Sequence, residues 1–213
     1  MNTLLKSLVI RSPFYGMLRS IAQRKELRIW EKTMRPGPLP QLLKETILRN
    51  YADQFALNTL VETGTYLGDM VSALKDSFDE IFTIELDGYL YRRAKQKFSR
   101  YPHIHVLQGD SGEVLPQILV SLDKTKRALF WLDAHYCGGI TPKTVIETPV
   151  IKELECILTH FDCHYVILVD DARCFTGKNG YPTISGLVTL VSTKCPTIVA
   201  EIENDIIRIH PKA

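Results

Sequence analysis

Residues 59–70 read TLVETGTYLGDM, an apolar run that ends in a glutamate and passes through two glycines into a helix-like segment. Two glycines between a strand and a helix let the backbone turn sharply and approach a ligand closely. The helix start behind them presents free N–H groups and a positive dipole end, which favour an anionic group such as a carboxylate. Tyr66 stands where the dinucleotide fingerprint G-x-G-x-x-G has its second glycine. Because a bulky side chain there would obstruct a pyrophosphate, the motif disfavours NAD and FAD.

This strand-and-helix unit repeats along the chain. Apolar runs end at Glu62, Glu85, Gln108, Asp133 and Asp170, and the first three intervals are 23, 23 and 25 residues. Each interval is long enough for a strand and a returning helix. The runs are continuously apolar, which is typical of strands covered on both faces of a sheet. The pattern predicts an α/β fold with a doubly wound, mostly parallel, Rossmann-like sheet.

The end of the chain breaks this rhythm. Residues 196–211 read PTIVAEIENDIIRIHP, which predicts two strands joined by a tight turn at residues 203–205. A turn of that length makes the two strands antiparallel. We therefore expect a seven-stranded sheet that ends in an antiparallel hairpin.

The first 40 residues differ in charge from the rest. They carry eight Lys or Arg and two Glu, whereas the remaining chain is mildly acidic. Two short amphipathic helices are expected there, broken at Pro13 and ended by the proline-rich stretch 36–40. Residues 1–40 would form a basic helical arm or lid, and residues 41–213 the main domain. The arm could fold over the body or a partner subunit, lie on an anionic membrane surface, or act as a mitochondrial presequence; its short apolar face favours the first.

Composition excludes several classes of protein. The 213 residues are 45% hydrophobic with a net charge of +2, which argues against a disordered chain and against a protein that coats nucleic acid. The five cysteines include no C-x-x-C pair, a pattern that suits reduced thiols in the cytosol. No apolar stretch approaches the roughly 18–20 residues needed to cross a bilayer. We expect a cytoplasmic protein without a transmembrane segment or a nucleic-acid partner, which could form a homo-oligomer.

The ends of the apolar runs are the expected ligand site, because open α/β sheets bind ligands at the carboxyl ends of their strands. Four of the five runs finish with a carboxylate. Gathered at one edge, these groups would repel and need cations or hydrogen-bond donors around them. Glu85 lies 21 residues after Gly64, where an acidic side chain can accept hydrogen bonds from both ribose hydroxyls. Asp110 and Ser111 follow the third run and could meet an adenine amino group.

Four motifs in order carry a resemblance to a known family. They are E-x-G-x-Y-x-G at 62–68, IELD at 84–87, GDS at 109–111 and FWLD at 130–133. From about residue 60 to the end, the chain resembles class I S-adenosylmethionine-dependent methyltransferases, nearest to the metal-dependent small-molecule O-methyltransferases of the catechol, caffeoyl-CoA and macrolide-sugar types. The resemblance implies methyl transfer from S-adenosylmethionine to an oxygen of a small-molecule acceptor.

The resemblance also implies residue roles in binding the cofactor. The methionine part would be lined by Glu62, Gly64, Tyr66 and Gly68. Glu85 would hold the ribose, Asp110 and Ser111 would frame the adenine, and Asp133 would also touch the cofactor. Two of these residues have a simpler interpretation, in which Tyr66 is a packing aromatic and Asp110 is a helix N-cap.

A divalent metal is the second implied ligand. In the metal-dependent enzymes one Asp after the fourth strand and an acidic or amide pair after the fifth hold the cation, and here these positions are Asp133, Asp170 and Asp171. Oxygen ligands select a hard cation such as Mg²⁺, which would lower the pKa of the acceptor oxygen and position it. Alternatively, Asp133 only touches the cofactor and the Asp pair caps the next helix.

The catalytic base is less defined by the motifs. Catechol-type enzymes have a lysine three residues beyond the first metal Asp, where this chain has Tyr136. His135 could replace it as the base beside Asp133, act as a fourth metal ligand, or be a polar residue of the pocket rim. Arg173 and Lys178 could attract an acidic or phosphorylated acceptor, but the favoured interpretation is that they are solvated loop charges. The remaining alternatives are metal-independent transfer to nitrogen or a carboxylate, and a cofactor-binding module without turnover.

Overall fold

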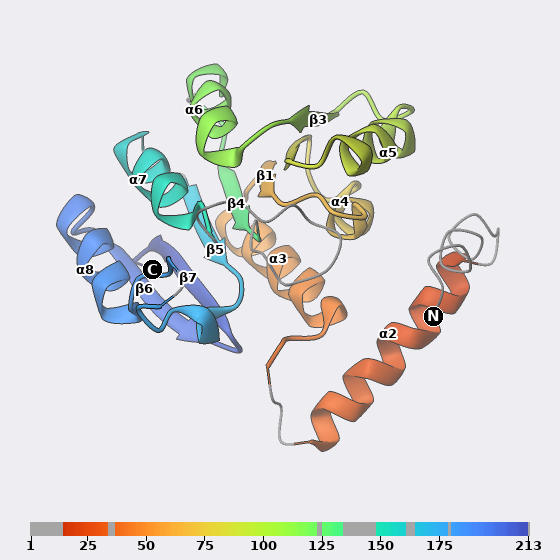
Figure 1. Cartoon of the computed structure of the whole chain (residues 1–213), viewed down its shortest axis with the longest axis horizontal. Helices are drawn as coiled ribbons and strands as arrows, with labels where there is room; N and C mark the ends of the chain where they lie inside the picture. The colour runs from red at the N-terminus through yellow and green to blue at the C-terminus, as the bar shows by residue number, and fades with distance from the viewer. Residues whose placement is uncertain are drawn as a thin grey trace.

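Seven strands form one sheet in the order β3-β2-β1-β4-β5-β7-β6 (Figure 1). The structure is a computed structural model that describes residues 15–33, 37–122, 125–133, 148–160, 165–178 and 180–212. Within these ranges the strands are β1 (Thr59–Thr63), β2 (Glu80–Glu85), β3 (Ile104–Gln108), β4 (Ala128–Leu132), β5 (Tyr165–Val169), β6 (Ile198–Glu203) and β7 (Ile206–Pro211).

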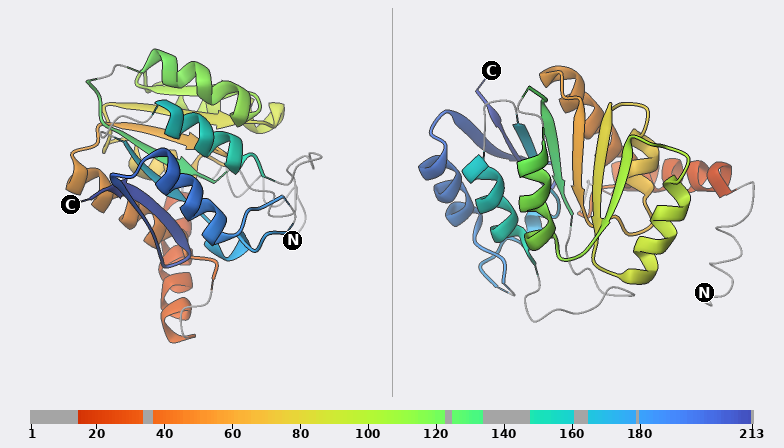
Figure 2. Two further views of the ribbon diagram at one scale, coloured as in Figure 1. Left: turned by 90° about the vertical axis from the view of Figure 1, so that its left-hand side faces the viewer. Right: turned by 90° about the horizontal axis from the view of Figure 1, so that it is seen from above.

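Helices cover both faces of this sheet (Figures 1 and 2). One face packs against α6 (Ser111–Ser121), α7 (Val150–His160) and α8 (Ile184–Lys194). The other packs against α3 (Gln41–Phe55), α4 (Asp69–Leu74) and α5 (Gly88–Phe98). A short 3-10 helix, Ala172–Cys174, follows β5. The three-layer arrangement explains why the strand sequences are apolar without alternation.

Strand directions confirm the predicted fold class. Strands β1 to β5 pair in parallel, whereas β7 is antiparallel to both β5 and β6. The predicted run ends fall at or next to the strand ends: Glu85 and Gln108 end β2 and β3, and Asp133 and Asp170 directly follow β4 and β5. The sheet is therefore doubly wound and mostly parallel, with a closing hairpin, as expected.

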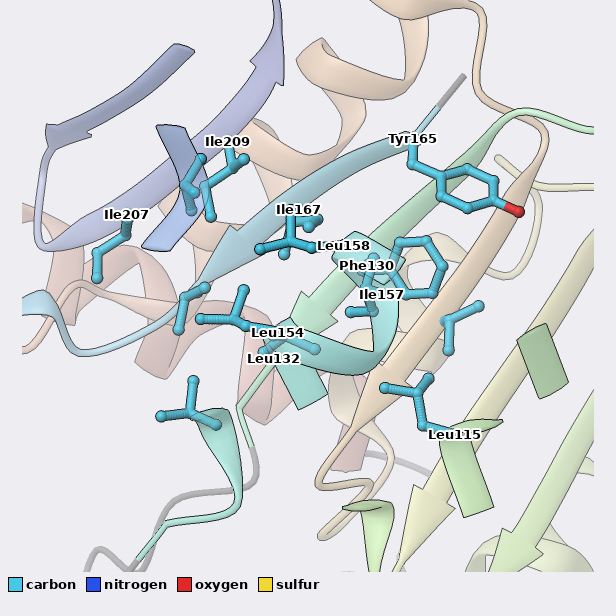
Figure 3. Packing of buried hydrophobic residues seen from close by; sticks show 14 of the residues in the cluster. Leu115, Phe130, Leu132, Leu154, Ile157, Leu158, Tyr165, Ile167, Ile207 and Ile209 are labelled. Atoms are coloured by element: carbon cyan, nitrogen blue, oxygen red, sulfur yellow. The ribbon is translucent and has the colours of Figure 1, made fainter. Parts of the chain in front are cut away.

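All five residues of β4 and of β5 are buried, and successive residues point to opposite layers. Phe130 and Leu132 belong to the core beneath α7, whereas Trp131 between them belongs to the core beneath α3. Figure 3 shows the first of these cores, in which α7 packs over β4, β5 and β7. The labelled residues at its centre are Phe130, Leu132, Leu154, Ile157, Leu158, Ile167, Ile207 and Ile209.

The N-terminal region contributes α2 (Tyr15–Lys32), so a helix follows Pro13 as predicted, although with 18 residues it is not short; the helix predicted before Pro13 lies outside the described residues. Figure 1 shows α2 as a long helix beside the α3 layer. Arg19 on α2 forms ion pairs with Glu45 on α3 (3.4 Å) and Asp69 at the start of α4 (3.5 Å). In the described part of the chain, no helix is long and apolar enough to span a membrane.

The hairpin turn holds the segment that follows β5. Asn204 and Asp205 have φ angles of 51° and 62°, the left-handed pair that a type I′ turn requires. The Asp205 carbonyl accepts a hydrogen bond from the Ala172 N–H (2.9 Å), and its carboxylate accepts one from the Arg173 N–H (2.8 Å). The turn thus fixes the backbone next to Asp170 and Asp171.

Replacing Asn204 tests this turn. A β-branched residue is strained at positive φ, so Asn204→Val should lower the free energy of unfolding by about 1–2 kcal/mol, whereas Asn204→Gly should leave it unchanged or raise it slightly. Urea unfolding followed by circular dichroism measures both. Equal stability of the two variants would show that the turn conformation is not under strain.

Candidate functional site

The loops at the carboxyl edge of the sheet are tied to one another through the backbone. The loops after β1, β3, β4 and β5 each donate an N–H to a carbonyl at the end of a neighbouring strand, at 3.0–3.1 Å. The pairs are Gly64 with Ile84, Gly109 with Glu85, Asp133 with Thr63, and Asp170 with Leu132. Residues predicted from four separate motifs therefore gather at one edge.

The loop after β1 depends on its two glycines. Gly64 and Gly68 have φ angles of 90° and 66°, and Tyr66 between them also has a positive φ of 49°. A Cβ on Gly68 would lie 2.7 Å from the Phe98 ring of α5, so only glycine fits. The Lys97 ammonium donates to the carbonyls of Leu67 (2.8 Å) and Gly68 (2.9 Å). The loop is thus held tightly against α5, while the Tyr66 side chain is 51% exposed.

Glu85 connects this loop to the one that follows β2. Its carboxylate accepts hydrogen bonds from the Tyr66 N–H (2.7 Å) and the Asp87 N–H (2.9 Å), and the side chain is buried. The residue predicted to hold the ribose therefore lies beside the glycine loop, as a ribose site requires. Its contact with a ribose stays a prediction.

Glu62 lies at the end of a chain of hydroxyl groups. It accepts a hydrogen bond from the Thr83 hydroxyl, which lies 2.6 Å from the Thr65 hydroxyl. Burial, supported by repulsion from Glu85, raises the pKa of Glu62 to about 8 despite the Thr83 hydrogen bond. At neutral pH the Glu62 carboxyl is therefore mostly protonated and can donate as well as accept.

The start of α6 contains the residues predicted to frame the adenine. Asp110 is the helix N-cap and accepts a hydrogen bond from the Gly112 N–H (2.8 Å), so its simpler interpretation is confirmed. Ser111 is buried at the first helical position. Glu153 of α7 is fully buried near Ser111 and Thr63, and burial raises its pKa to about 7. The adenine contacts stay predictions.

Asp133, Asp170 and Asp171, which we call the acidic cluster, lie at the ends of β4 and β5. Lys44, from the first turn of α3, forms a buried ion pair with Asp170. Arg173 forms ion pairs with Asp171 (2.8 Å) and with Asp205 in the hairpin turn. Arg173 therefore bridges two carboxylates, and because its side chain is 39% exposed it is a solvated charge, as expected, that is also paired.

Charge in the acidic cluster is balanced by these cations. Burial lowers the pKa of Lys44, but the attraction of Asp170 and Asp133 outweighs burial and raises it overall. Burial and repulsion from Asp170 raise the pKa of Asp133 well above its usual range. Lys44 thus stays an ammonium, and Asp133 favours its protonated form.

The predicted magnesium ligands do not fit a divalent cation in this arrangement. Among the described residues, no group of three or more His, Cys, Asp or Glu side chains could hold a metal ion. Asp170 and Asp171 each face a cation of the chain instead. His135, which we predicted as base or fourth ligand, lies outside the described residues, as does most of the 137–148 loop. The predicted magnesium site therefore has no support among the described residues.

The sequence analysis did not identify Lys44 and Glu153 as residues of the site, although the sequence pattern around each could have done so. Lys44 stands four residues before Leu48 and seven before Tyr51, on the stripe of α3 that is buried. Glu153 lies among the buried residues of α7, between Val150 and Ile157. A charged residue on an otherwise apolar helix stripe is the pattern that would have found both.

Comparisons with known proteins agree with the predicted fold. No protein-family model and no curated protein matches the sequence. An O-methyltransferase from Bacillus cereus in complex with S-adenosylhomocysteine matches with a TM-score of 0.60 and 14% identity, over 89% of this chain and 90% of that chain. The S-adenosylhomocysteine-bound methyltransferase PaMTH1 from Podospora anserina matches with a TM-score of 0.58 and 16% identity, over 95% and 97%.

A Staphylococcus aureus protein assigned as a caffeoyl-CoA O-methyltransferase also matches, with a TM-score of 0.58 and 14% identity, over 92% of this chain and 98% of that chain. Likeness at such low identity establishes the fold. The chain therefore has the fold of class I S-adenosylmethionine-dependent methyltransferases, and its structural neighbours include O-methyltransferases, as the motifs predicted.

The pKa of Glu62 can be tested through stability. Because the folded chain binds this proton more tightly than the unfolded chain, wild-type stability should fall as the pH rises from 4.5 to about 8. Relative to Glu62→Gln, which imitates the protonated form, the fall should be about 1 kcal/mol per pH unit, measured by urea unfolding. Glu155→Gln, on the exposed side of α7, should keep the wild-type pH dependence. A difference between wild type and Glu62→Gln that does not change with pH would refute the assignment.

Proposed function

We propose that the chain transfers a methyl group from S-adenosylmethionine to an oxygen of a small-molecule acceptor. The observation that carries the proposal is the junction of the glycine loop with Glu85 at the carboxyl edge of the sheet. This is the place where open α/β sheets bind their ligands. The fold shared with S-adenosylhomocysteine-bound enzymes supports the choice of cofactor.

The cofactor would lie along this edge. The turn at Gly64 and Gly68 lets backbone N–H groups approach the amino-acid part, which Glu62 and Tyr66 would also line. Glu85 would accept hydrogen bonds from the ribose hydroxyls. Asp110 and Ser111 would flank the adenine, and Asp133 would lie beside the cofactor near the acceptor.

The transfer itself is an in-line displacement. The acceptor oxygen attacks the methyl carbon, a C–O bond forms as the C–S bond breaks, and sulfur keeps the bonding electrons to give S-adenosylhomocysteine. The proton of the acceptor hydroxyl passes to a base, for which His135 stays the predicted residue. The protein's main contribution is to align the oxygen with the methyl group, which lowers the barrier by replacing a bimolecular encounter.

The surroundings of the acceptor are proposals from the sequence. The basic arm of residues 1–40 and the loop from Cys137 to Thr148 would cover it. A cytoplasmic location, a homo-oligomer and contact of the arm with a membrane surface likewise stay predictions.

Cofactor binding is the direct test of this proposal. Calorimetry should show S-adenosylhomocysteine binding with a Kd on the order of micromolar, and no binding of NADH. Gly68→Ala should weaken that binding by about tenfold or more, because the added Cβ meets Phe98 and displaces the loop. Gly177→Ala is the matched control, since its φ of 79° and its 2.9 Å contact with Thr183 impose similar strain away from the loop. Binding of NADH in place of S-adenosylhomocysteine would overturn the proposal.

Turnover is tested with a labelled methyl donor and a cell extract as the source of acceptors. We expect label in a small-molecule fraction, in an ether linkage that resists mild alkali. His135→Ala should slow the transfer while leaving S-adenosylhomocysteine binding intact. Cofactor binding without transfer to any acceptor would instead identify a binding module without turnover.

A further inference from the structure

The position of Lys44 bears on how the acidic cluster works. Lys44 comes from a helix that precedes the whole sheet in the sequence, yet its ammonium reaches the end of β5. Its side chain is 12% exposed and that of its partner Asp170 is 1% exposed. The ammonium also lies 5.9 Å from the centre of the Trp131 ring, within reach of a cation–π contact. Lys44 is therefore held in place from two sides.

The acidic cluster needs positive charge, and the chain supplies it. Carboxylates gathered at a buried edge repel one another unless cations or donors lie between them. Lys44 attracts Asp133 and Asp171 as well as its direct partner Asp170. Asp171 is also paired with Arg173. A divalent cation bound to the same carboxylates would have to displace the Lys44 ammonium or lie beside it, where like charges repel strongly in a poorly solvated site.

The ion pair between Lys44 and Asp170 leaves hydrogen-bonding groups that a ligand could use. The Oδ1 atom of Asp170 is buried and has no hydrogen-bond partner among the described residues. An ammonium has three N–H donors, and in the same part of the chain Asp170 is the acceptor that Lys44 contacts. A buried acceptor and a cation with spare donors, side by side, suit a hydroxyl group of a ligand, which can donate to the carboxylate and accept from the ammonium.

We propose that Lys44 is the resident cation of the acidic cluster and takes the place that a divalent metal occupies in metal-dependent enzymes of this fold. Lys44 keeps divalent cations out of the cluster and supplies positive charge beside the acceptor oxygen. The metal-exclusion part stands on the ion pair alone. The role beside the acceptor rests on the proposed function, and there Lys44 is a positioning residue that makes methyl transfer independent of Mg²⁺.

Terbium luminescence tests the exclusion without any need for turnover. Tb³⁺ is a hard cation that prefers oxygen ligands, and a nearby tryptophan sensitises its emission. Wild type should bind Tb³⁺ weakly and therefore give little emission sensitised through Trp131. Lys44→Met should bind Tb³⁺ at least about tenfold more tightly than wild type, because the substitution removes the positive charge. Methionine is itself a poor ligand for hard cations, so the gain would come from the carboxylates. Lys44→Arg, which keeps the charge, should behave as wild type.

Two further variants locate the signal. Both are made in the Lys44→Met background. Asp170→Asn should abolish the Tb³⁺ emission, whereas Trp30→Phe, which leaves Trp131 as the single tryptophan, should preserve it. Wild type that binds Tb³⁺ as tightly as Lys44→Met, with loss of binding in Asp170→Asn, would overturn the proposal. If Lys44→Met does not fold, wild type, Lys44→Arg and Asp170→Asn still decide the question.

The catalytic part is tested with EDTA. Wild-type methyl transfer should keep its rate after chelation, and added Mg²⁺ should not raise it. Loss of transfer in EDTA with recovery in Mg²⁺ would overturn the role of Lys44. Complete absence of transfer under all conditions would instead refute the proposed function, and the terbium comparison would remain decisive for metal exclusion.

Discussion

Buried carboxyl groups at one edge of the sheet are the constraint on which the site depends. Parallel strands bring their ends together, and in this chain those ends carry Glu62, Glu85, Asp133 and Asp170. Each needs a partner to lie in a poorly solvated place. The partners are a threonine hydroxyl, two backbone N–H groups, and the Lys44 ammonium, which attracts both aspartates. Each buried carboxyl group at this edge is thus stabilised by its own partner, and the partners come from different elements of the fold.

Much of this architecture is readable in the sequence because it follows from local patterns. Continuous apolar runs at regular intervals predicted the parallel strands, and the turn at residues 203–205 predicted the hairpin, including its antiparallel direction. The motifs after the strands predicted which residues would meet, since strand ends in a parallel sheet share an edge. The motif after β1 also identified Gly68 as a residue of the site, although its close contact with Phe98 depends on how α5 packs.

What the sequence hid are the contacts between distant segments. Lys44 and Asp170 are 126 residues apart, and no local pattern links them. The pairing of Arg173 was also hidden, because its partner Asp205 lies in the hairpin turn, which only the tertiary fold brings near. Asp110 could be interpreted in two ways because an acidic residue before a helix both caps it and faces the ligand edge. Side-chain pairing across elements is set by packing, and one sequence does not reveal it.

Arg19 connects helix α2 to two parts of the site, helix α3 and the start of helix α4. Its guanidinium pairs with Glu45, the neighbour of Lys44 in the sequence, and with Asp69, the first residue after the glycine loop. One side chain therefore spans the helix that supplies the buried ammonium and the helix whose start would face the methionine moiety. Whatever draws α2 away from the body, whether a partner or a lipid surface, removes positive charge from both places at once. Displacement of α2 would therefore change the electrostatics of α3 and of the start of α4 in a single step.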